Sequence, residues 1–598
     1  ATGDNDGISI TNIYITGTAQ LVNDGKAPVL VSTVPAEGAT NASANGKIVL
    51  TFDEKVKLTD KAHATLGTEK IEGVVSGKTI TFAYKGLNYA TAYIFTLAAG
   101  SVADLTDNAT DQAIVLNFTT KTKPAVTKAL YDFIVPTDGD FKAALAAAAK
   151  RTDTSKRFRI FIKQGDYKIP ADEKSKVTGS DGKSYANPTT YMNTPNVSII
   201  GEGMDNTSLT NTVPNSGQAA NVLEGIGKGD VLCLQKGATN TYFQDLKMYS
   251  SMGDAKGRDI VLNDQSNKTI CKNVNLWAYQ DTYVSNNQNG KFYFEDGILR
   301  GRTDYLCGKG DVYYNNVELW ICEKGGYLAV PSQPKKYGYI FKDCTIKDAT
   351  AAKDLNGNYT LGRPWGKGTP IALYIDTKME AIPSAAGWNE MSGGYPKRFA
   401  EYNSYTTTGS VVDLKDRKKV YDAYDSKDGD NYVNRRNETP ESPILTAEEA
   451  ATYTLETVMG QDDDWDPTAA TEQASAPANV KLNGTTLAWD NNDYALLWAV
   501  CKNGKVVDFT IKPTYLVDDA SATWSVRAAN EMGGLSEATA AVLGTGIQNI
   551  ASATDAAVTK TAIYAADGTQ LSNLQKGINI VVKTLADGSK KTSKVIVK

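Results

Sequence analysis

Similar short strands, each built around an Asp or Asn, recur through the middle of the chain. In each copy apolar and polar residues alternate, and the polar anchors follow one another at intervals of 28, 23, 20 and 27 residues. A unit of this length is too short to bury its own apolar face, so neighbouring units must stack to share a core. The units carry strand patterns without helices, which predicts a right-handed parallel β-helix. The anchors are Asp245, Asn273, Asp296, Asn316 and Asp343.

The sequence on both sides of the repeats also predicts β structure. Short alternating strands such as Lys47–Phe52, separated by Gly and Asn turns, resemble a bacterial Ig-like domain. Strands such as Trp524–Ala528 resemble a fibronectin type III module, and Ile563–Gly568 resembles the C-terminal β-modules of exported Bacteroidetes proteins. We therefore predict an all-β chain with an extension at 1–27, an Ig-like sandwich at 28–122, the β-helix at 125–470, a fibronectin-like sandwich at 475–545 and a sorting or attachment module at 546–598.

Two helices are predicted at the edges of the solenoid. Asp140–Lys150 is rich in alanine and has Asp at its cap. Thr446–Met459 begins with a Thr-x-x-Glu capping box and stops at Gly460. The following Asp462–Asp464 run has the composition of a calcium clip, but such runs are usually solvated loops, and we predict no metal there.

Composition excludes several classes of protein. The chain of 598 residues has one histidine, His63, so a Ser-His-Asp hydrolase, a His-paired cysteine nucleophile or a His-rich zinc site cannot form away from it. Its net charge of −5 gives no reason to bind nucleic acid, and no apolar run reaches the length of a membrane-spanning helix. The six cysteines form no CxxC pair, so we interpret most of them as buried thiols. No cofactor is predicted, and an enzyme here must use carboxylates.

Two aspartates occupy equivalent positions in successive repeats. Asp281 lies eight residues after Asn273, and Asp304 lies eight residues after Asp296. Equal offsets in neighbouring rungs stack at about 4.8 Å, so the two carboxylates should lie side by side on one face. Repulsion should then raise the pKa of one carboxyl group and leave the other ionised, which is an acid next to a nucleophile. Spacing alone leaves a chance coincidence open.

The residues around this pair carry a family resemblance. Ala278–Thr282 resembles the GYQDT motif of pectin methylesterases, Gly301–Gly308 resembles their GxVDFIFG motif, and Leu361–Trp365 matches their LGRPW motif without change. Weaker matches include Ala386–Trp388 and Ala400–Tyr402, and the motifs keep their order over about 270 residues. The chain is thus similar to pectin methylesterases between about Tyr131 and Asn403.

The resemblance implies a role for each residue of the site. Asp304 would be the nucleophile that attacks the methyl-ester carbonyl of a galacturonate unit. Asp281 would protonate the departing methanol and then act as base on water. Gln280 would donate to the oxyanion, and Arg363 would hold Asp304 ionised.

The resemblance also implies substrate contacts. Trp365 and Trp388 would be sugar-stacking walls of the cleft, and Arg258, Tyr283 and Tyr305 would be further substrate-binding residues. The implied ligand is methyl-esterified homogalacturonan, bound without a metal.

Three departures from the family pattern affect the expected site. The family carries a glutamine one rung upstream in a QAVAL-like segment, where this chain has Gly257–Leu262, with Arg258 or Asp259 at that place. The second oxyanion donor is therefore open, and Arg258 is a cationic substitute. The family's Leu-Tyr after the acid is Tyr283–Val284, and a Phe of the nucleophile motif is Cys307.

Two other functions stay open at this point. A β-helix polygalacturonase or lyase would cut the polymer, but the first should have a histidine and the second a calcium cluster. A non-catalytic pectin-binding protein should have lost Asp281, Asp304 or Arg363, and all three are present. The appended β-modules favour a monomer exported from a bacterium, and Ala1 fits either a removed signal peptide or a shortened chain.

Overall fold

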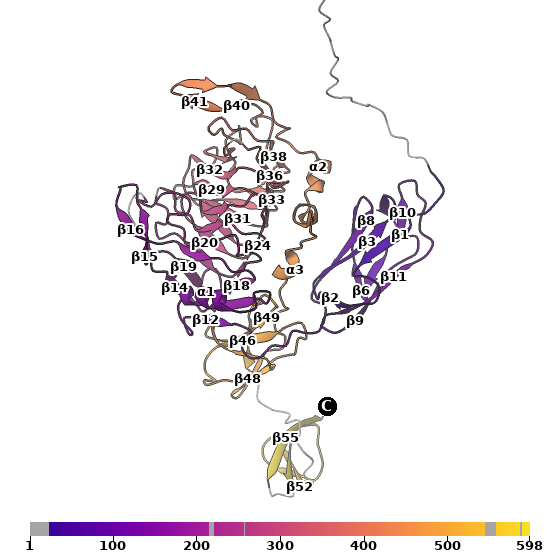
Figure 1. The fold of residues 1–598 in the computed structure, drawn as a ribbon. Helices are drawn as coiled ribbons and strands as arrows, with labels where there is room; N and C mark the ends of the chain where they lie inside the picture. Colours follow the sequence, from indigo (N-terminus) through magenta and orange to yellow (C-terminus); the bar gives the residue numbers. More distant parts are fainter. Residues whose placement is uncertain are drawn as a thin grey trace, which may run out of the picture. The chain divides into compact units, whose positions relative to one another are not determined.

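The structure is a computed structural model that describes residues 23–214, 221–255, 257–366, 368–543, 558–585 and 589–597. The chain forms two compact units, Ala1–Lys123 and Pro124–Lys598 (Figure 1). The structure confirms the predicted fold class, an all-β architecture with a parallel β-helix.

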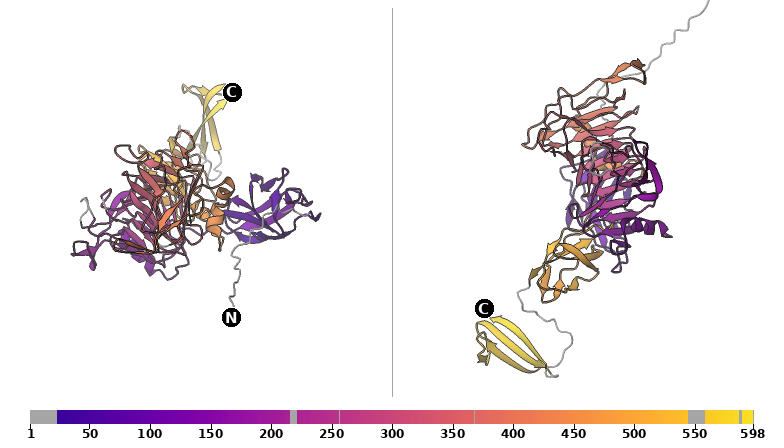
Figure 2. Two further views of the ribbon diagram at one scale, coloured as in Figure 1. Left: turned by 90° about the horizontal axis from the view of Figure 1, so that it is seen from above. Right: turned by 90° about the vertical axis from the view of Figure 1, so that its left-hand side faces the viewer.

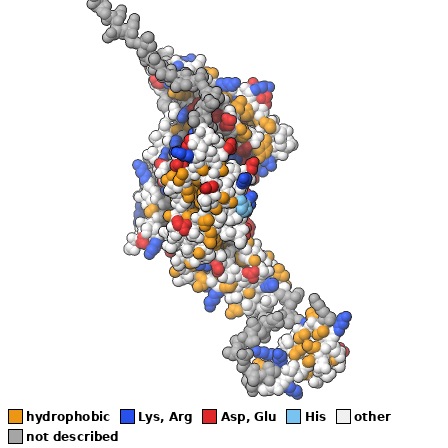
Figure 3. All heavy atoms as spheres, turned by 90° about the vertical axis from the view of Figure 1, so that its right-hand side faces the viewer, with side chains coloured by type: hydrophobic (Ala, Val, Ile, Leu, Met, Phe, Trp, Pro, Cys, Tyr) orange, Lys and Arg blue, Asp and Glu red, His pale blue; other side chains and the backbone are white. Residues whose placement is uncertain are grey.

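The first unit is a two-layer β-sandwich. Its layers enclose a core that includes Ile48, Phe82 and Phe95. The single histidine, His63, is exposed on this unit (Figure 3). One sheet has the order β1 (Leu30–Val34), β3 (Gly46–Phe52), β8 (Thr79–Tyr84), β7 (Gly73–Ser76); the other has the order β2 (Ala39–Ala42), β11 (Ile114–Thr120), β9 (Ala92–Leu97), β5 (Ala64–Leu66), β6 (Glu69–Ile71); β4 (Val56–Leu58) pairs with β10 (Val102–Asp104).

The second unit is built around a parallel β-helix of three sheets, seen from three sides in Figures 1 and 2. The first sheet contains β12 (Phe133–Val135), β13 (Phe158–Ile162), β18 (Val197–Ile200), β21 (Tyr242–Gln244), β24 (Thr269–Lys272), β27 (Lys291–Glu295), β30 (Asp311–Asn315), β33 (Tyr339–Lys342), β36 (Ile371–Ile375) and β38 (Arg398–Tyr402). The second contains β14 (Gly165–Lys168), β19 (Thr207–Thr210), β22 (Lys247–Tyr249), β25 (Asn275–Trp277), β28 (Ile298–Gly301), β31 (Glu318–Ile321), β34 (Thr345–Asp348), β37 (Lys378–Met379) and β39 (Tyr405–Thr406). The third contains β17 (Thr190–Met192), β20 (Leu232–Leu234), β23 (Leu262–Asp264), β26 (Tyr283–Ser285), β29 (Thr303–Gly308), β32 (Gly326–Pro331) and β35 (Tyr359–Gly362).

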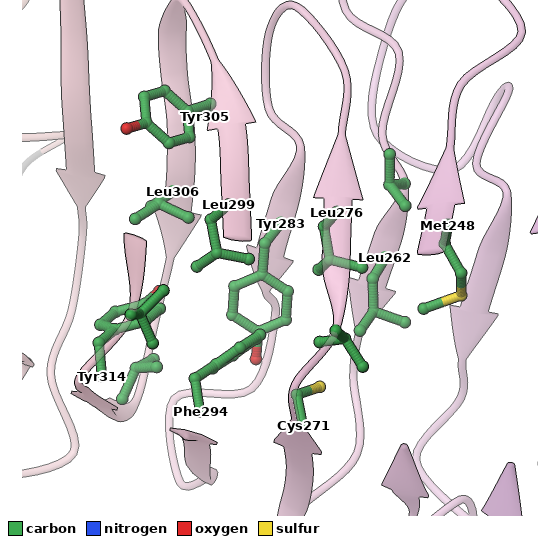
Figure 4. Close-up of a cluster of buried hydrophobic side chains, with 14 of the residues drawn as sticks. Met248, Leu262, Cys271, Leu276, Tyr283, Phe294, Leu299, Tyr305, Leu306 and Tyr314 are labelled. Atoms are coloured by element: carbon green, nitrogen blue, oxygen red, sulfur yellow. The ribbon is translucent and has the colours of Figure 1, made fainter. Parts of the chain in front are cut away.

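Aromatic rings stack along the inside of the solenoid. The ring centroids of Phe294 and Tyr314 are 5.2 Å apart, those of Tyr314 and Phe341 4.6 Å, and those of Phe341 and Tyr374 4.2 Å. Leu276, Leu299 and Leu306 fill the space beside the stack (Figure 4). One residue from each rung therefore contributes to a continuous core, as the repeat length requires.

The repeat anchors lie where the chain turns between the first and second sheets. All five have left-handed φ angles, between +49° and +57°. Asp and Asn tolerate this conformation better than other side chains with a Cβ. Their side chains also pair between rungs, from Asn273 Nδ2 to Asp245 Oδ1 at 2.6 Å and from Asn316 Nδ2 to Asp296 Oδ1 at 2.8 Å. The corner thus explains the repeating Asp and Asn of the sequence.

The predicted helices occur, with one difference. α1 (Phe141–Lys150) is capped by Asp140, whose side chain accepts from the Ala143 amide. α2 (Ala447–Thr452) has the expected capping box of Thr446 and Glu449. The prediction of one helix to Met459 is wrong. The chain leaves the helix at Tyr453, whose carbonyl accepts from the Tyr313 hydroxyl. It then forms one wide helical turn, η1 (Glu456–Gly460).

Residues 441–475, which we call the strap, run back along the first sheet. The strap contacts Arg398 through Glu449, then Lys335 through Asp462, and then Lys291 and Lys268 through Asp463. α3 (Thr468–Thr471) follows, and its Thr471 donates to Glu295. The Asp462–Asp464 run is therefore not only a solvated loop, since two of its carboxylates pair with lysines. Among the described residues no cluster of His, Cys, Asp or Glu could hold a metal ion.

The strap leads into a second β-sandwich that packs on the first rung of the solenoid. Phe509 of the sandwich lies 4.8 Å from the Tyr131 ring and 5.2 Å from the Phe161 ring. Glu202 accepts hydrogen bonds at 2.9 Å from the Gln164 amide in the solenoid and the Val506 amide in the sandwich. The sheets are β48 (Thr514–Leu516), β45 (Thr486–Ala488), β44 (Lys481–Asn483), β51 (Val542–Leu543) and β47 (Lys505–Thr510), β46 (Leu497–Lys502), β49 (Trp524–Ala529), β50 (Thr539–Ala540).

Smaller elements complete the chain. The hairpins at the end of the solenoid away from β12 are visible in Figure 1. They and the other remaining strands are β15 (Asp172–Thr178) with β16 (Ser184–Asn187), β40 (Tyr421–Ala423) with β43 (Arg436–Glu438), β41 (Ser426–Asp428) with β42 (Asn431–Val433), and the C-terminal sheet β53 (Gln570–Leu571), β52 (Val558–Ala565), β54 (Gly577–Leu585), β55 (Lys590–Val597).

Candidate active site

Asp281 and Asp304 occupy the same position in neighbouring rungs. Tyr283 of β26 pairs with Leu306 of β29, and Gln280 bridges to Thr303, so each residue of one rung lies beside the residue 23 positions later. Both aspartates have left-handed φ angles, +58° and +50°, and both are nearly buried. The stacking expected from equal offsets is confirmed.

Arg363 binds the carboxylate of Asp304 with two parallel hydrogen bonds. Nε donates to Oδ1 at 2.9 Å and an Nη donates to Oδ2 at 2.6 Å. Arg363 follows β35 directly, and its guanidinium lies over the ring of Tyr327 at 3.8 Å. The contact expected between Arg363 and Asp304 is confirmed. Tyr327 is a supporting residue that the motifs did not indicate, because it lies in β32 outside all of them.

The environment of Asp281 favours its neutral form. Burial and the negative charge of Asp304 raise the pKa of Asp281 to about 7, against the opposing effect of Arg258, Arg363 and a hydrogen bond from the Cys307 thiol. Near neutral pH the site can therefore hold one ionised carboxylate beside one carboxylic acid.

Arg258 reaches the acid from the preceding rung. It bridges to Gln280 through the backbone, and its Nε lies 3.4 Å from Asp281 Oδ2. About half of the Arg258 side chain is exposed, so the guanidinium borders both the acid and solvent. Asp259 next to it is buried and accepts from the amides of Tyr279 and Gln280.

A small apolar cluster lies beside the carboxylates at the third sheet. Its buried residues are Ile260, Val284, Cys307 and Val330, one from each of four successive rungs. Trp365 packs against them while remaining partly exposed, as do Ile226 and Met391, which the sequence motifs did not indicate. Of this cluster, only the partly exposed Trp365, Ile226 and Met391 are open to contact with a ligand.

Three predicted substrate contacts are wrong. Trp388 is buried and packs on Phe399 with ring centroids 4.7 Å apart. Tyr283 and Tyr305 are fully buried core residues. Asp304 and Tyr305 lie at an irregularity between Thr303 and Leu306, where the left-handed Asp faces outward and the following Tyr turns into the solenoid. Consecutive positions in a motif therefore face opposite sides of the wall.

The comparisons with known proteins agree with this architecture. The chain combines a parallel β-helix that carries a site of two paired carboxylates with a separate Ig-like unit. These two features define its class of protein. Residues 132–435 match the family model described as Pectinesterase, and residues 24–120 match the one described as Bacterial Ig-like domain. Because the first match covers half of the chain, the chain belongs to the pectinesterase family.

Individual relatives share part of their length with this chain. Pectinesterase 2.1 of Solanum lycopersicum is 24% identical over 295 residues, which are 47% of this chain and 48% of that protein. Probable pectinesterase A of Aspergillus flavus is 29% identical over 165 residues, 26% of this chain and 48% of that protein. The chain thus spans about half the length of these curated relatives. Among solved structures, pectin methylesterase PemA from Erwinia chrysanthemi is 20% identical with a TM-score of 0.40, covering 57% of this chain and 99% of that one.

Proposed function

We propose that this protein removes methyl esters from the galacturonate units of pectin, releasing methanol and leaving pectate. The observation that carries the proposal is the Asp304 carboxyl group, bound by both arms of Arg363 and stacked beside Asp281, whose pKa burial and Asp304 raise to about 7. Family membership supports the same reaction.

In the first half of the reaction, Asp304 acts as the nucleophile. One of its oxygens attacks the carbonyl carbon of the methyl ester and forms a tetrahedral intermediate. The Gln280 side-chain amide is the proposed donor to the oxyanion, and Arg258 is the second candidate because it borders the same rung. The bond from carbon to methoxyl oxygen then breaks, the Asp281 proton moves to that oxygen, and methanol leaves an acyl-enzyme anhydride.

In the second half, Asp281 acts as the base. It is now ionised and takes a proton from water as the water oxygen attacks the anhydride. The galacturonate carboxyl group is released, Asp304 returns as a carboxylate, and Asp281 regains its proton. The partly exposed Trp365 is proposed to hold the sugar, with Ile226 and Met391 beside it as the apolar contacts for the methyl group.

The setting of the reaction follows from its substrate. Pectin is a polymer outside the cell that makes it, so we propose that a bacterium exports this protein, as a monomer, to its surface, periplasm or surroundings. Among the described residues, no helix is long and apolar enough to cross a membrane.

A product assay separates the candidate functions. Highly methylated pectin is incubated with the full chain, and methanol, new reducing ends and ultraviolet-absorbing unsaturated ends are measured together. We expect methanol alone. Reducing ends would indicate a polygalacturonase, unsaturated ends a lyase, and binding without product a non-catalytic protein.

Two aspartate variants identify the nucleophile. Asp304→Asn should abolish methanol release because an amide cannot form the anhydride. Asp343→Asn is the matched control, since Asp343 has the same left-handed conformation but lies at the far corner of the solenoid. Near-normal turnover by Asp304→Asn would contradict the proposed mechanism.

A further inference from the structure

A third carboxyl group, that of Asp259, lies next to the aspartate pair. The Asp259 amide donates to the Gln280 carbonyl at 3.3 Å, so Asp259 lies one rung before Asp281, as Asp281 lies one rung before Asp304. Only 1% of Asp259 is exposed. The reaction proposed above uses the other two carboxyl groups and leaves this one without a role.

Asp259 forms hydrogen bonds with the segment that carries Asp281. Its Oδ1 accepts from the amide of Tyr279 at 3.3 Å and from the amide of Gln280 at 3.4 Å. These are the two peptide groups immediately before Asp281. Its Oδ2 is buried without a hydrogen-bond partner. One oxygen therefore holds the turn, and the other is the position at which a proton would sit.

The surroundings of Asp259 disfavour a negative charge. Burial raises its pKa to about 8, and the charge of Asp281 acts in the same direction, against the two amides and the Ser250 hydroxyl. The nearest cation in sequence, Arg258, directs its guanidinium at Asp281. An ionised Asp259 would place a second negative charge behind the acid and behind the oxyanion that forms in front of it.

We propose that Asp259 is a positioning residue: as a neutral carboxylic acid it fixes the Tyr279–Gln280 peptide, and thereby the directions of the Gln280 amide and the Asp281 carboxyl group. The inference rests on the proposed function for its effect on catalysis. Asparagine imitates the neutral acid, because its amide oxygen can accept the same two bonds and its NH₂ replaces the O–H.

The activity test compares two substitutions at this position. Asp259→Asn should keep kcat within about threefold of the unmodified chain, whereas Asp259→Ala should lower kcat at least tenfold with little change in KM. Asp264→Asn is the control, since Asp264 is also a fully buried acid whose Oδ2 has no partner, while its Oδ1 accepts from Ser266 and not from the site. An inactive Asp259→Asn, or a fully active Asp259→Ala, would overturn the proposal.

Two measurements without substrate keep the inference separate from the proposed function. Hydrogen exchange of the 278–282 amides should be faster in Asp259→Ala than in Asp259→Asn, which should match the unmodified chain. The second is thermal unfolding against pH. Unfolded Asp loses its proton near pH 4 and native Asp259 near pH 8, so this group makes the native state less stable as pH rises between these values.

Asp259→Asn should remove that loss, giving a smaller decrease of Tm from pH 5 to pH 8 than the unmodified chain. An unchanged slope would mean that native Asp259 is ionised and would refute the neutral-acid claim. If the unmodified chain releases no methanol, the proposed function fails, while both measurements still decide how Asp259 is protonated and what it holds.

Discussion

Replacing Arg258 by Gln tests how the site sets the pKa of its acid. Arg258 lies 3.4 Å from Asp281 and lowers the pKa of that carboxyl group. Two unit charges about 4 Å apart interact by about 1 kcal/mol in water and about 4 kcal/mol near a protein surface. Since half of the Arg258 side chain is exposed, we take the lower value, equivalent to about 0.7 of a pH unit.

The direction of the expected pH shift depends on which protonation state of Asp281 is active. The first step needs the neutral acid, so kcat/KM should fall as pH rises through about 7. Without the cation the neutral form of Asp281 persists to higher pH, so Arg258→Gln should shift this alkaline limb upward by about 0.7 of a pH unit. Methanol release is measured from pH 5 to 9, with Arg300→Gln as control because Arg300 lies on the second sheet and pairs with Asp254. A limb that stays in place or moves downward would refute the electrostatic reasoning.

Three further outcomes are expected. Arg363→Lys keeps the charge but loses the paired bonds to Asp304, and should lower kcat about thirtyfold, equivalent to about 2 kcal/mol, at constant fold by circular dichroism. Phe509→Ala should destabilise the second unit by about 3 kcal/mol in denaturant unfolding, because the ring is buried against Tyr131 and Phe161; an unchanged midpoint would mean that the contact is absent in solution. Asp463→Asn should destabilise the second unit by about 2 kcal/mol, less than for a fully buried ion pair. The pKa of Asp463 is lowered to about 2, so the stabilisation from this pair is present at neutral pH and is lost as pH falls through 2. The stabilities of the variant and the unmodified chain should therefore converge in acid.

The solenoid and its carboxylate pair could be predicted because both follow from one local requirement. A left-handed corner accepts Asp or Asn, so the corner repeats visibly in sequence, and residues at a fixed distance from it stack. Whether a side chain points into the solenoid or out of it is harder to predict from the sequence. Tyr305 turns inward because of an irregularity beside Asp304, and no sequence period marks it.

Contacts between distant segments could not be predicted where no motif or repeat marks them. At the helix break, the Tyr453 carbonyl accepts from the Tyr313 hydroxyl, and on the first rung Phe161 contacts Phe509. The predicted domain bounds of 125–470 leave the second sandwich out of the β-helix unit. The structure makes 124–543 the better fragment, since the shorter one would expose Tyr131 and Phe161; comparing the two remains the test of these boundaries.

The order in which the chain is made bears on how the strap and its sandwich assemble. Tyr131 donates to the carbonyl of Gly533, which is 402 residues further along. During synthesis the first rung therefore stays uncovered, with Phe161 exposed, until almost the whole of the second unit has left the ribosome. Contacts of such long sequence separation slow folding and leave apolar surface open to aggregation. The last segment to arrive completes the first rung, so the second unit should acquire its full stability in one late step.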